Sequence, residues 1–221
     1  NIHIISAGRT DARVHATGMI AGFRTETKID NFFQFLLSIN HLCGRHLSAI
    51  DMKEVPESFH PQYSCTEREY QYWIFVSKFP SPLLNGRAYF FKAKFDFEKI
   101  REECKSLVGK HDFTSFAKPI ALLKKTPVRT VSKLDIRESN EVKGLYKLEI
   151  RSSGFLHNMV RIIAGTLLDI GKGKIKDRNI TEILEKKDRK YAGTTLPAHG
   201  LYFRRATYEK FPEINSFYEK K

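Results

Sequence analysis

One segment in the first third of the chain, EREYQYWIFVS, constrains the fold more than any other. Successive side chains of a β-strand point to opposite faces, so Tyr70, Tyr72 and Ile74 share one face of a strand here. Trp73 and Phe75 then lie on the other face. Because large apolar side chains occupy both faces, we predict a strand that is covered on both sides.

The rest of the chain mixes helical and strand patterns. Apolar residues at helical spacing predict helices, and alternation predicts further strands. Two helices are expected to begin after Asp30 and Asp96, and two more are expected over residues 156–170 and 180–184. The expected strands cover residues 2–6, 16–24, 128–136 and 145–151 and the end of AGTTLPAHGLYF. Since short polar turns join neighbouring strands, we predict an α+β fold with an antiparallel or mixed sheet.

The organisation of the chain suggests two successive halves. Residues 1–95 and 96–212 each contain strands and helices, without a strong sequence repeat between them. The Pro- and Gly-containing stretch SKFPSPLLNGR is the expected junction. Residues 213–221 are polar, and we expect them to form a frayed tail.

The net charge of the chain indicates what kind of partner it binds. Lys and Arg number 38 against 25 Asp and Glu, for a formal net charge of +13. Such an excess favours a polyanionic partner, although a basic, solvated surface without a partner has the same composition. The sequence has no apolar run near the length of a membrane span and no signal-peptide pattern, so we expect no membrane partner.

The cysteines and histidines indicate no disulfide framework or metal site. Cys43, Cys65 and Cys104 are an odd number, widely spaced and without a CxxC pair, which is typical of reduced intracellular thiols. The stretch HLCGRH lacks the further ligands of a zinc site. We therefore expect no metal and an intracellular protein, most simply cytoplasmic, with mitochondrial or nuclear locations left open.

One carboxylate stands out as a candidate for chemistry. In SAGRTDARVHA, Asp11 has Arg9 two residues before it and Arg13 two residues after it. A nearby guanidinium keeps a carboxylate ionised at neutral pH, which suits a nucleophile or a stabiliser of positive charge. A structural Arg–Asp pair that holds the turn is the alternative, and both interpretations stand on these residues alone.

A candidate arginine lies in the expected helix 156–170. Arg161 falls off the apolar stripe of that helix, with His157, Asn158 and Gly165 as neighbours at helical spacing, so it occupies a polar strip. A helix-surface ion pair is the alternative role.

Five blocks of the sequence, in order, resemble the TruA-type tRNA pseudouridine synthases. GRTDARVHA is similar to the family's GRTDAGVHA, and the other blocks are FHPQYSCTEREYQYWIF, GKHDFTSFAK, GFLHNMVRIIAGTLLDIGKGK and AGTTLPAHGLYF. The blocks span residues 6–203. The resemblance implies two ferredoxin-like α/β halves that share a mixed, mainly antiparallel sheet. The family's first strand and helix, with a G-W-Q-like segment, are expected to be absent from this chain.

The resemblance also implies a reaction and roles for single residues. The reaction is the isomerisation of uridine to pseudouridine in the tRNA anticodon stem-loop, at positions 38–40, by a homodimer that needs no cofactor. Asp11 would be the nucleophile or charge stabiliser, Arg9 would pair with it, and Arg161 would be the active-site arginine. Tyr70 would stack on or hydrogen-bond the target base, and Leu201 would form an apolar wall against it, although both are core residues by default.

Two departures from the family pattern affect the site. Arg13 replaces a glycine in the GRTDA turn, where glycine indicates a backbone conformation that disfavours a side chain. The family's FHAR is FHPQ here, which removes a cation at Gln62. A non-catalytic RNA-binding α+β module is therefore the alternative function. A sugar hydrolase would need a second carboxylate, for which Asp112 is the candidate.

Overall fold

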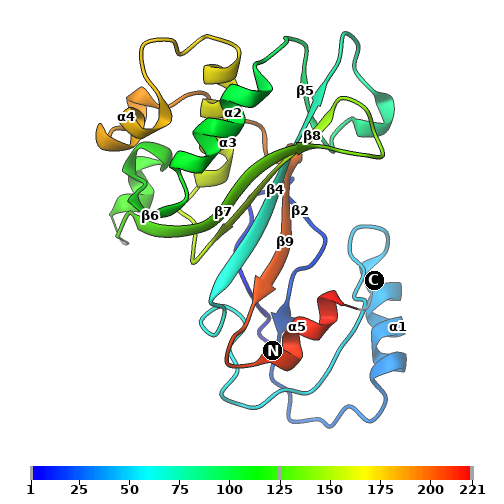
Figure 1. Ribbon diagram of the computed structural model, residues 1–221. Helices are drawn as coiled ribbons and strands as arrows, with labels where there is room; N and C mark the ends of the chain where they lie inside the picture. The colour runs from blue at the N-terminus through cyan, green and yellow to red at the C-terminus, as the bar shows by residue number, and fades with distance from the viewer. Residues whose placement is uncertain (1, 124–125, 220–221) are drawn as a thin grey trace. The chain divides into compact units, whose positions relative to one another are not determined.

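The aromatic segment forms strand β4 (Glu67–Val76), which lies inside a sheet in the computed structural model. The structure describes residues 2–123 and 126–219. Over these residues the sheet has seven strands in the order β2-β9-β4-β8-β7-β6, with β5 also paired to β4 (Figure 1). The remaining strands are β2 (His15–Ala16), β5 (Tyr89–Phe91), β6 (Gly109–Asp112), β7 (Val128–Glu138), β8 (Leu145–Ser152) and β9 (Leu201–Thr207).

Most of the pairings whose direction is known are antiparallel. Strand β8 pairs antiparallel with both β4 and β7, and β6 pairs antiparallel with β7. The pairs β2–β9 and β4–β5 are parallel. The expected α+β class with a mixed, mainly antiparallel sheet is confirmed, and β7 and β8 form a hairpin.

Helices cover one face of this sheet. Figure 1 shows α2 (Phe97–Ser106), α3 (Met159–Gly171) and α4 (Ile180–Glu185) gathered on the same side. Helix α2 begins where Asp96 caps it by accepting a hydrogen bond from the Lys99 amide, 3.0 Å long. A Cβ on Gly171 would lie 2.5 Å from Ile100 Cδ1, so glycine allows α3 to pack closely against α2.

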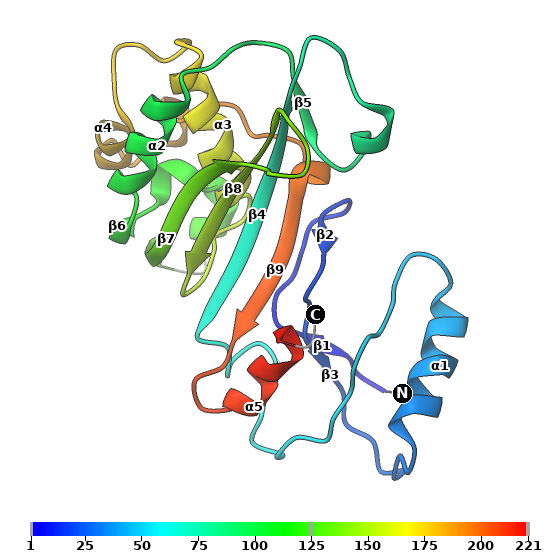
Figure 2. The ribbon, with the colours of Figure 1, turned by 45° about the vertical axis from the view of Figure 1, so that its right-hand side comes forward.

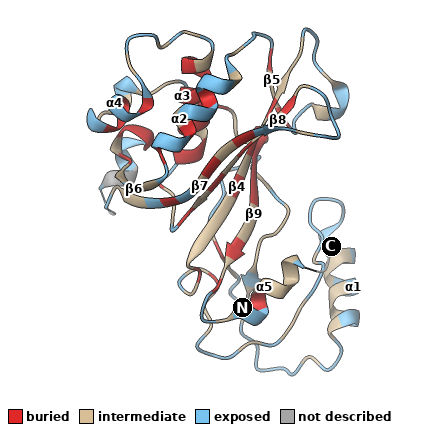
Figure 3. Ribbon diagram, in the orientation of Figure 1, coloured by how far each residue is buried: buried red, intermediate tan, exposed pale blue. Residues whose placement is uncertain are grey.

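The two faces of β4 are covered to different degrees. Tyr72 and Ile74 are buried on one face, while Trp73 and Phe75 are half-buried on the other. Figure 3 colours the ribbon by this burial. The Trp73 ring stacks on Tyr202, with the ring centroids 4.3 Å apart. Coverage on both sides is thus confirmed, but aromatic neighbours rather than helices provide it on the second face.

A second compact unit consists of segments far apart in the sequence. It comprises Asn1–Gly8, Ile20–Thr66 and Thr207–Lys221, whereas Arg9–Met19 and Glu67–Ala206 form the unit that contains the large sheet. Its elements are β1 (Ile5–Ser6), β3 (Ala21–Gly22), α1 (Phe32–Cys43) and α5 (Pro212–Asn215), and β1 pairs antiparallel with β3 (Figure 2). The Phe59 ring packs against Tyr208, whose buried hydroxyl donates a 2.8 Å hydrogen bond to the Pro61 carbonyl.

Short 3-10 helices complete the described elements. They are η1 (Pro82–Leu84), η2 (Thr114–Phe116), η3 (Pro119–Leu122), η4 (Arg189–Tyr191), η5 (Ala198–Gly200) and η6 (Ser216–Tyr218). Within the ranges that the structure describes, every helix falls short of the length and apolarity needed to cross a bilayer.

The compact units differ from the expected halves 1–95 and 96–212. Strand β4 pairs with β8 across that boundary, so residues 67–95 belong with the second half of the chain. The stretch SKFPSPLLNGR therefore lies within one unit. The expected strand 16–24 is two short strands, β2 and β3, which pair with different partners.

The expectation of a frayed polar tail over residues 213–221 is wrong for its first part. Residues 212–215 form α5, and the Ile214 side chain is 1% exposed. The Tyr208 amide donates to the Asn215 side chain, and that side chain donates back to the Tyr208 carbonyl, each bond being 3.1 Å long. One buried isoleucine and a reciprocal amide contact therefore hold this segment in the smaller unit.

We predict that Ile214→Ala lowers the free energy of unfolding by about 2–5 kcal/mol, because it removes a fully buried side chain and leaves a cavity. Chemical denaturation of the purified protein measures this loss. Glu213→Ala, at the exposed neighbouring position, serves as the control and should change stability by less than about 0.5 kcal/mol. Equal stability of the Ile214→Ala variant and the wild type would contradict the buried assignment.

Candidate active site

Asp11 begins a tight turn that leads into the large sheet. The Val14 amide donates a 3.1 Å hydrogen bond to the Asp11 carbonyl, and Arg13 has a φ of 69°. This hydrogen bond, with a positive φ at the third residue only, is typical of a type II turn. Strand β2 follows at once and pairs with β9, so the sheet fixes where the turn lies.

The side chain that binds Asp11 comes from the first turn of α3. Arg161 Nη1 donates to Asp11 Oδ2 at 2.8 Å and to Asn158 Oδ1 at 2.7 Å, and Arg161 Nε donates to the Leu196 carbonyl at 2.7 Å. Arg161 is 17% exposed and Asp11 is 36% exposed. The guanidinium is thus fixed in one orientation, and it holds a carboxylate that solvent and substrate can still reach.

The second oxygen of the same carboxylate has a histidine beside it. His157 Nε2 lies 3.4 Å from Asp11 Oδ1, and the His157 side chain is 44% exposed. The sequence placed His157 on the polar strip with Arg161 but revealed no pairing for it. Helix α3 begins at Met159 rather than at the expected residue 156, and Asn158 before it has a φ of 64°, so His157 reaches Asp11 from the turn that precedes the helix and not by helical spacing.

The ion pair expected between Arg9 and Asp11 is not formed. Over residues 2–123 and 126–219, the ion pairs of Asp11 are those with Arg161 and His157, and Arg9 is exposed. Asp11 pairs with Arg161 rather than Arg9 because other contacts already hold the Arg161 side chain in place. Three acceptors already hold the Arg161 guanidinium, whereas an exposed arginine would lose side-chain entropy on pairing.

A loop packed along α3 fixes the position of Arg161. The Leu196 amide donates a 3.2 Å hydrogen bond to the Arg161 carbonyl, so backbone and side chain of Arg161 both bind Leu196. A Cβ on Gly165 would lie 1.8 Å from the Thr194 carbonyl oxygen. Glycine at that position is therefore required for the loop to approach the helix.

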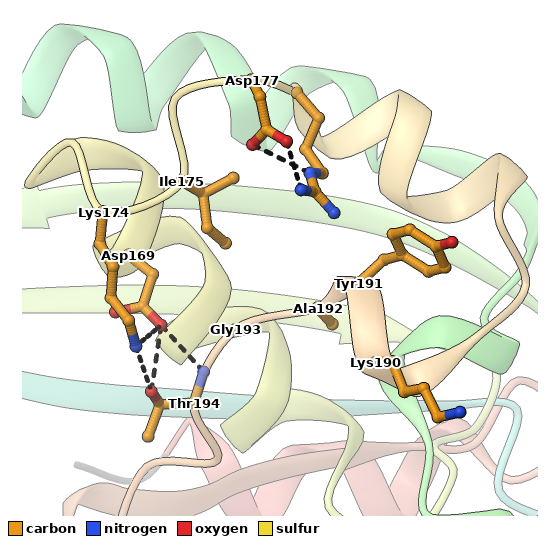
Figure 4. Close-up of a pocket in the computed structure, with 10 residues that line it drawn as sticks. Asp169, Lys174, Ile175, Asp177, Lys190, Tyr191, Ala192, Gly193 and Thr194 are labelled. Carbon is orange, nitrogen blue, oxygen red and sulfur yellow. Dashed lines mark hydrogen bonds and ion pairs between the residues drawn. The ribbon is translucent and has the colours of Figure 1, made fainter.

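A buried carboxylate anchors the same loop one turn further along. Asp169 accepts hydrogen bonds from the Thr194 amide and hydroxyl, each 3.0 Å long, and pairs with Lys174 (Figure 4). Lys172 lies 2.8 Å from its other oxygen. Burial alone would raise the pKa of Asp169, but the hydrogen bonds from Lys172 and Thr194 outweigh it and lower that pKa below its ordinary value.

The two residues expected to contact the base lie in the core near β9. Tyr70 is 7% exposed, and the rings of Phe155 and Phe203 meet it edge-on, with centroids 5.0 and 5.2 Å away. Leu201, the first residue of β9, is also 7% exposed. The structure brings Asp11 and Arg161 into direct contact, whereas it places Tyr70 and Leu201 on adjacent strands beneath the surface.

The second carboxylate considered for a hydrolase serves a structural purpose. Asp112 Oδ1 accepts hydrogen bonds from the Thr114 amide and hydroxyl, and Asp112 Oδ2 lies 3.3 Å from Lys187. Although burial would raise the pKa of Asp112, these contacts lower it overall. Oδ1 holds the turn before η2 and Oδ2 pairs with a lysine that follows α4, so a second catalytic carboxylate finds no support here.

Comparison with known proteins decides the family. The profile of the "tRNA pseudouridine synthase" family matches residues 104–209. A tRNA pseudouridine synthase A of Leptospira biflexa is 47% identical over 96% of this chain and 80% of its own length. The chain belongs to the tRNA pseudouridine synthase family. The namesake of Leptospira interrogans is 46% identical over 90% of this chain and 97% of its own length, and that of Bacillus subtilis is 38% identical over 94% and 82%.

Membership in the tRNA pseudouridine synthase family makes this chain an isomerase of uridine in tRNA. The fold agrees with this assignment. Arg161, His157 and Leu201 lie inside the matched profile, and the relatives' similarity extends over nearly the whole chain.

We predict that Arg161→Lys lowers kcat for pseudouridine formation on the order of a hundredfold, because one ammonium cannot reproduce three directed hydrogen bonds and the carboxylate loses its orientation. Single-turnover assays on unmodified tRNA measure the loss, and thermal denaturation is expected to change much less. Arg204→Lys is the control, because Arg204 donates one side-chain bond, to Thr17 Oγ1 at 2.8 Å, which a lysine can keep. A variant that melts early but turns over normally would refute this role.

We predict that Asp169→Asn destabilises the protein at pH 7 by about 1–3 kcal/mol, since it removes a buried anion from two lysines and the loop. Because folding lowers the pKa of Asp169, the carboxylate stabilises the fold above about pH 4, and this contribution disappears as the pH falls through the lowered pKa. Urea denaturation from pH 7 downward should show the two proteins converging in acid. Asp177→Asn, at an exposed carboxylate near the same loop, should change stability by less than about 1 kcal/mol.

Proposed function

We propose that this protein converts uridine to pseudouridine in the anticodon stem-loop of tRNA, at positions 38–40, with Asp11 as the nucleophile or charge stabiliser. One observation carries the proposal. The Asp11 carboxylate is 36% exposed, and both of its oxygens have nitrogen atoms of other side chains beside them, Arg161 Nη1 at 2.8 Å and His157 Nε2 at 3.4 Å.

The chemistry requires an anion that stays ionised while positive charge develops on the ribose. Breaking the bond between N1 of uracil and C1′ leaves an electron-deficient sugar carbon, which a carboxylate can attack or stabilise. The freed base turns, C5 bonds to C1′, the proton on C5 is lost and N1 gains a proton. Product and substrate are isomers, so the step needs no oxidant, reductant or added group.

The remaining expected residues fit supporting roles. Arg9 is exposed close to Asp11 in the chain and would bind the RNA rather than pair with the carboxylate. Tyr70 and Leu201, both 7% exposed, would contact the base once it has entered the site. A base that leaves a stem costs a few kcal/mol of stacking, which aromatic contacts and phosphate binding offset.

The proposal includes a homodimer in the cytoplasm. The homodimer rests on the family resemblance. Cytoplasmic location is supported by the three cysteines, which form no disulfide; two of them, Cys65 and Cys104, are buried. Buried thiols of this kind are typical of a reducing compartment.

The decisive experiment incubates the purified protein with unmodified tRNA and maps pseudouridine. We expect Asp11→Asn, which keeps the shape and removes the charge, to abolish modification, with a loss in kcat of at least about a thousandfold. Binding of tRNA should remain within about threefold of the wild type, since the anion itself attracts no phosphate.

Two results would overturn the assignment. Unchanged modification by Asp11→Asn and Asp11→Ala would remove Asp11 as the reacting group. If the wild type binds tRNA but never modifies it, the protein is a non-catalytic RNA-binding module. If modification is confined to nucleotides outside positions 38–40, the assigned reaction is correct but the assigned tRNA positions are wrong.

A further inference from the structure

We infer that Arg13 binds a backbone phosphate of the RNA next to the target uridine. This inference rests on the proposed function and concerns a side chain that the family signature lacks, because GRTDAGVHA has a glycine where this chain has Arg13. The site is the guanidinium of Arg13, and the ligand class is a phosphodiester.

The backbone conformation at Arg13 is one that disfavours a side chain. Its φ of 69° lies in the left-handed region, which is unfavourable for a residue other than glycine. The turn hydrogen bond from Val14 to Asp11 holds this conformation. Strain of this kind persists mainly where it serves a site, and here it lies in the turn that begins at Asp11.

In the described ranges, the side chains of the other non-glycine residues with positive φ make contacts within the protein. Asn158, with a φ of 64°, accepts the hydrogen bond from Arg161, and Lys187, with a φ of 47°, pairs with Asp112 at 3.3 Å. Arg13 is exposed, and within residues 2–123 and 126–219 its guanidinium has no ion pair or hydrogen bond. Its side chain therefore contributes nothing visible to the fold that would offset the strain.

The charge of Arg13 is also not needed by Asp11. Arg161 already binds that carboxylate at 2.8 Å, and His157 lies beside the other oxygen. The positive charge of Arg13 is thus uncompensated, two residues from the reacting group, on a chain with a net charge of +13.

A phosphate is the anion that this position would meet. A nucleotide whose ribose lies against Asp11 carries a phosphate on each side of that ribose, so one of them comes near a long side chain two residues away. Guanidinium binds phosphate through two parallel hydrogen bonds, and each phosphate contact releases counterions from the RNA.

The test separates the side chain from the backbone with three substitutions. Arg13→Gly and Arg13→Asn remove the charge and suit a positive φ, whereas Arg13→Lys keeps both the charge and the strain. Binding of an unmodified tRNA transcript is measured from low to high salt, together with the denaturation midpoint of each protein.

We expect Arg13→Gly and Arg13→Asn to unfold no more easily than the wild type, and Arg13→Gly to be the more stable. Both should bind tRNA about three- to tenfold more weakly at low salt, and the slope of log Kd against log salt should fall by about 0.7–0.9. Arg13→Lys should keep the wild-type slope. Arg137→Asn, which removes an exposed charge at the end of β7, is the control for net charge and should also keep it.

Three outcomes overturn the inference. Unchanged affinity and slope in Arg13→Gly would show that no phosphate is bound, and destabilisation of Arg13→Gly would assign the side chain to the fold. An equal loss of slope in Arg137→Asn would indicate a diffuse effect of charge. These binding readouts do not depend on turnover, so a wild type that binds tRNA without modifying it overturns the proposed function alone.

Discussion

The site depends on the hydrogen bonds that the guanidinium of Arg161 donates. Its hydrogen bonds join the Asp11 turn, Asn158 at the start of α3 and the carbonyl of Leu196. A planar guanidinium donates in fixed directions, so acceptors from three separate parts of the chain leave one orientation for the carboxylate. The residues around Asp11 in sequence contribute the turn, and the charge that orients it comes from 150 residues away.

That interaction in turn requires the packing of α3. The helix is buried along nearly its whole length, and Gly165 leaves space for the loop that carries Leu196. Asp169 ties the loop to the last turns of the helix through Thr194. Gly165 and Asp169 therefore act on the site indirectly, because they hold the loop that binds Arg161.

Much of the fold could be predicted because its elements carry strong local patterns. Strands β4, β7 and β8 and helix α4 match their expected ranges closely, and α2 begins after Asp96 as expected, since alternation and helical spacing extend over whole segments. The strands β2 and β3 have two residues each, which is too short for alternation to distinguish them from one longer strand. The segment 212–215 was missed because one buried residue, Ile214, decides its packing.

The fold class, the family resemblance and the candidacy of Asp11 and Arg161 follow from the order of the residues alone, because motif blocks and periodicity are local properties of the chain. The sequence also marked Arg13 as a departure at a position that favours glycine, and the φ of 69° agrees with that interpretation. Which cation binds Asp11 is settled by tertiary contacts, through Arg161. That choice depends on which side chain other contacts have already fixed, and spacing along the chain cannot reveal a partner held by a distant helix and loop.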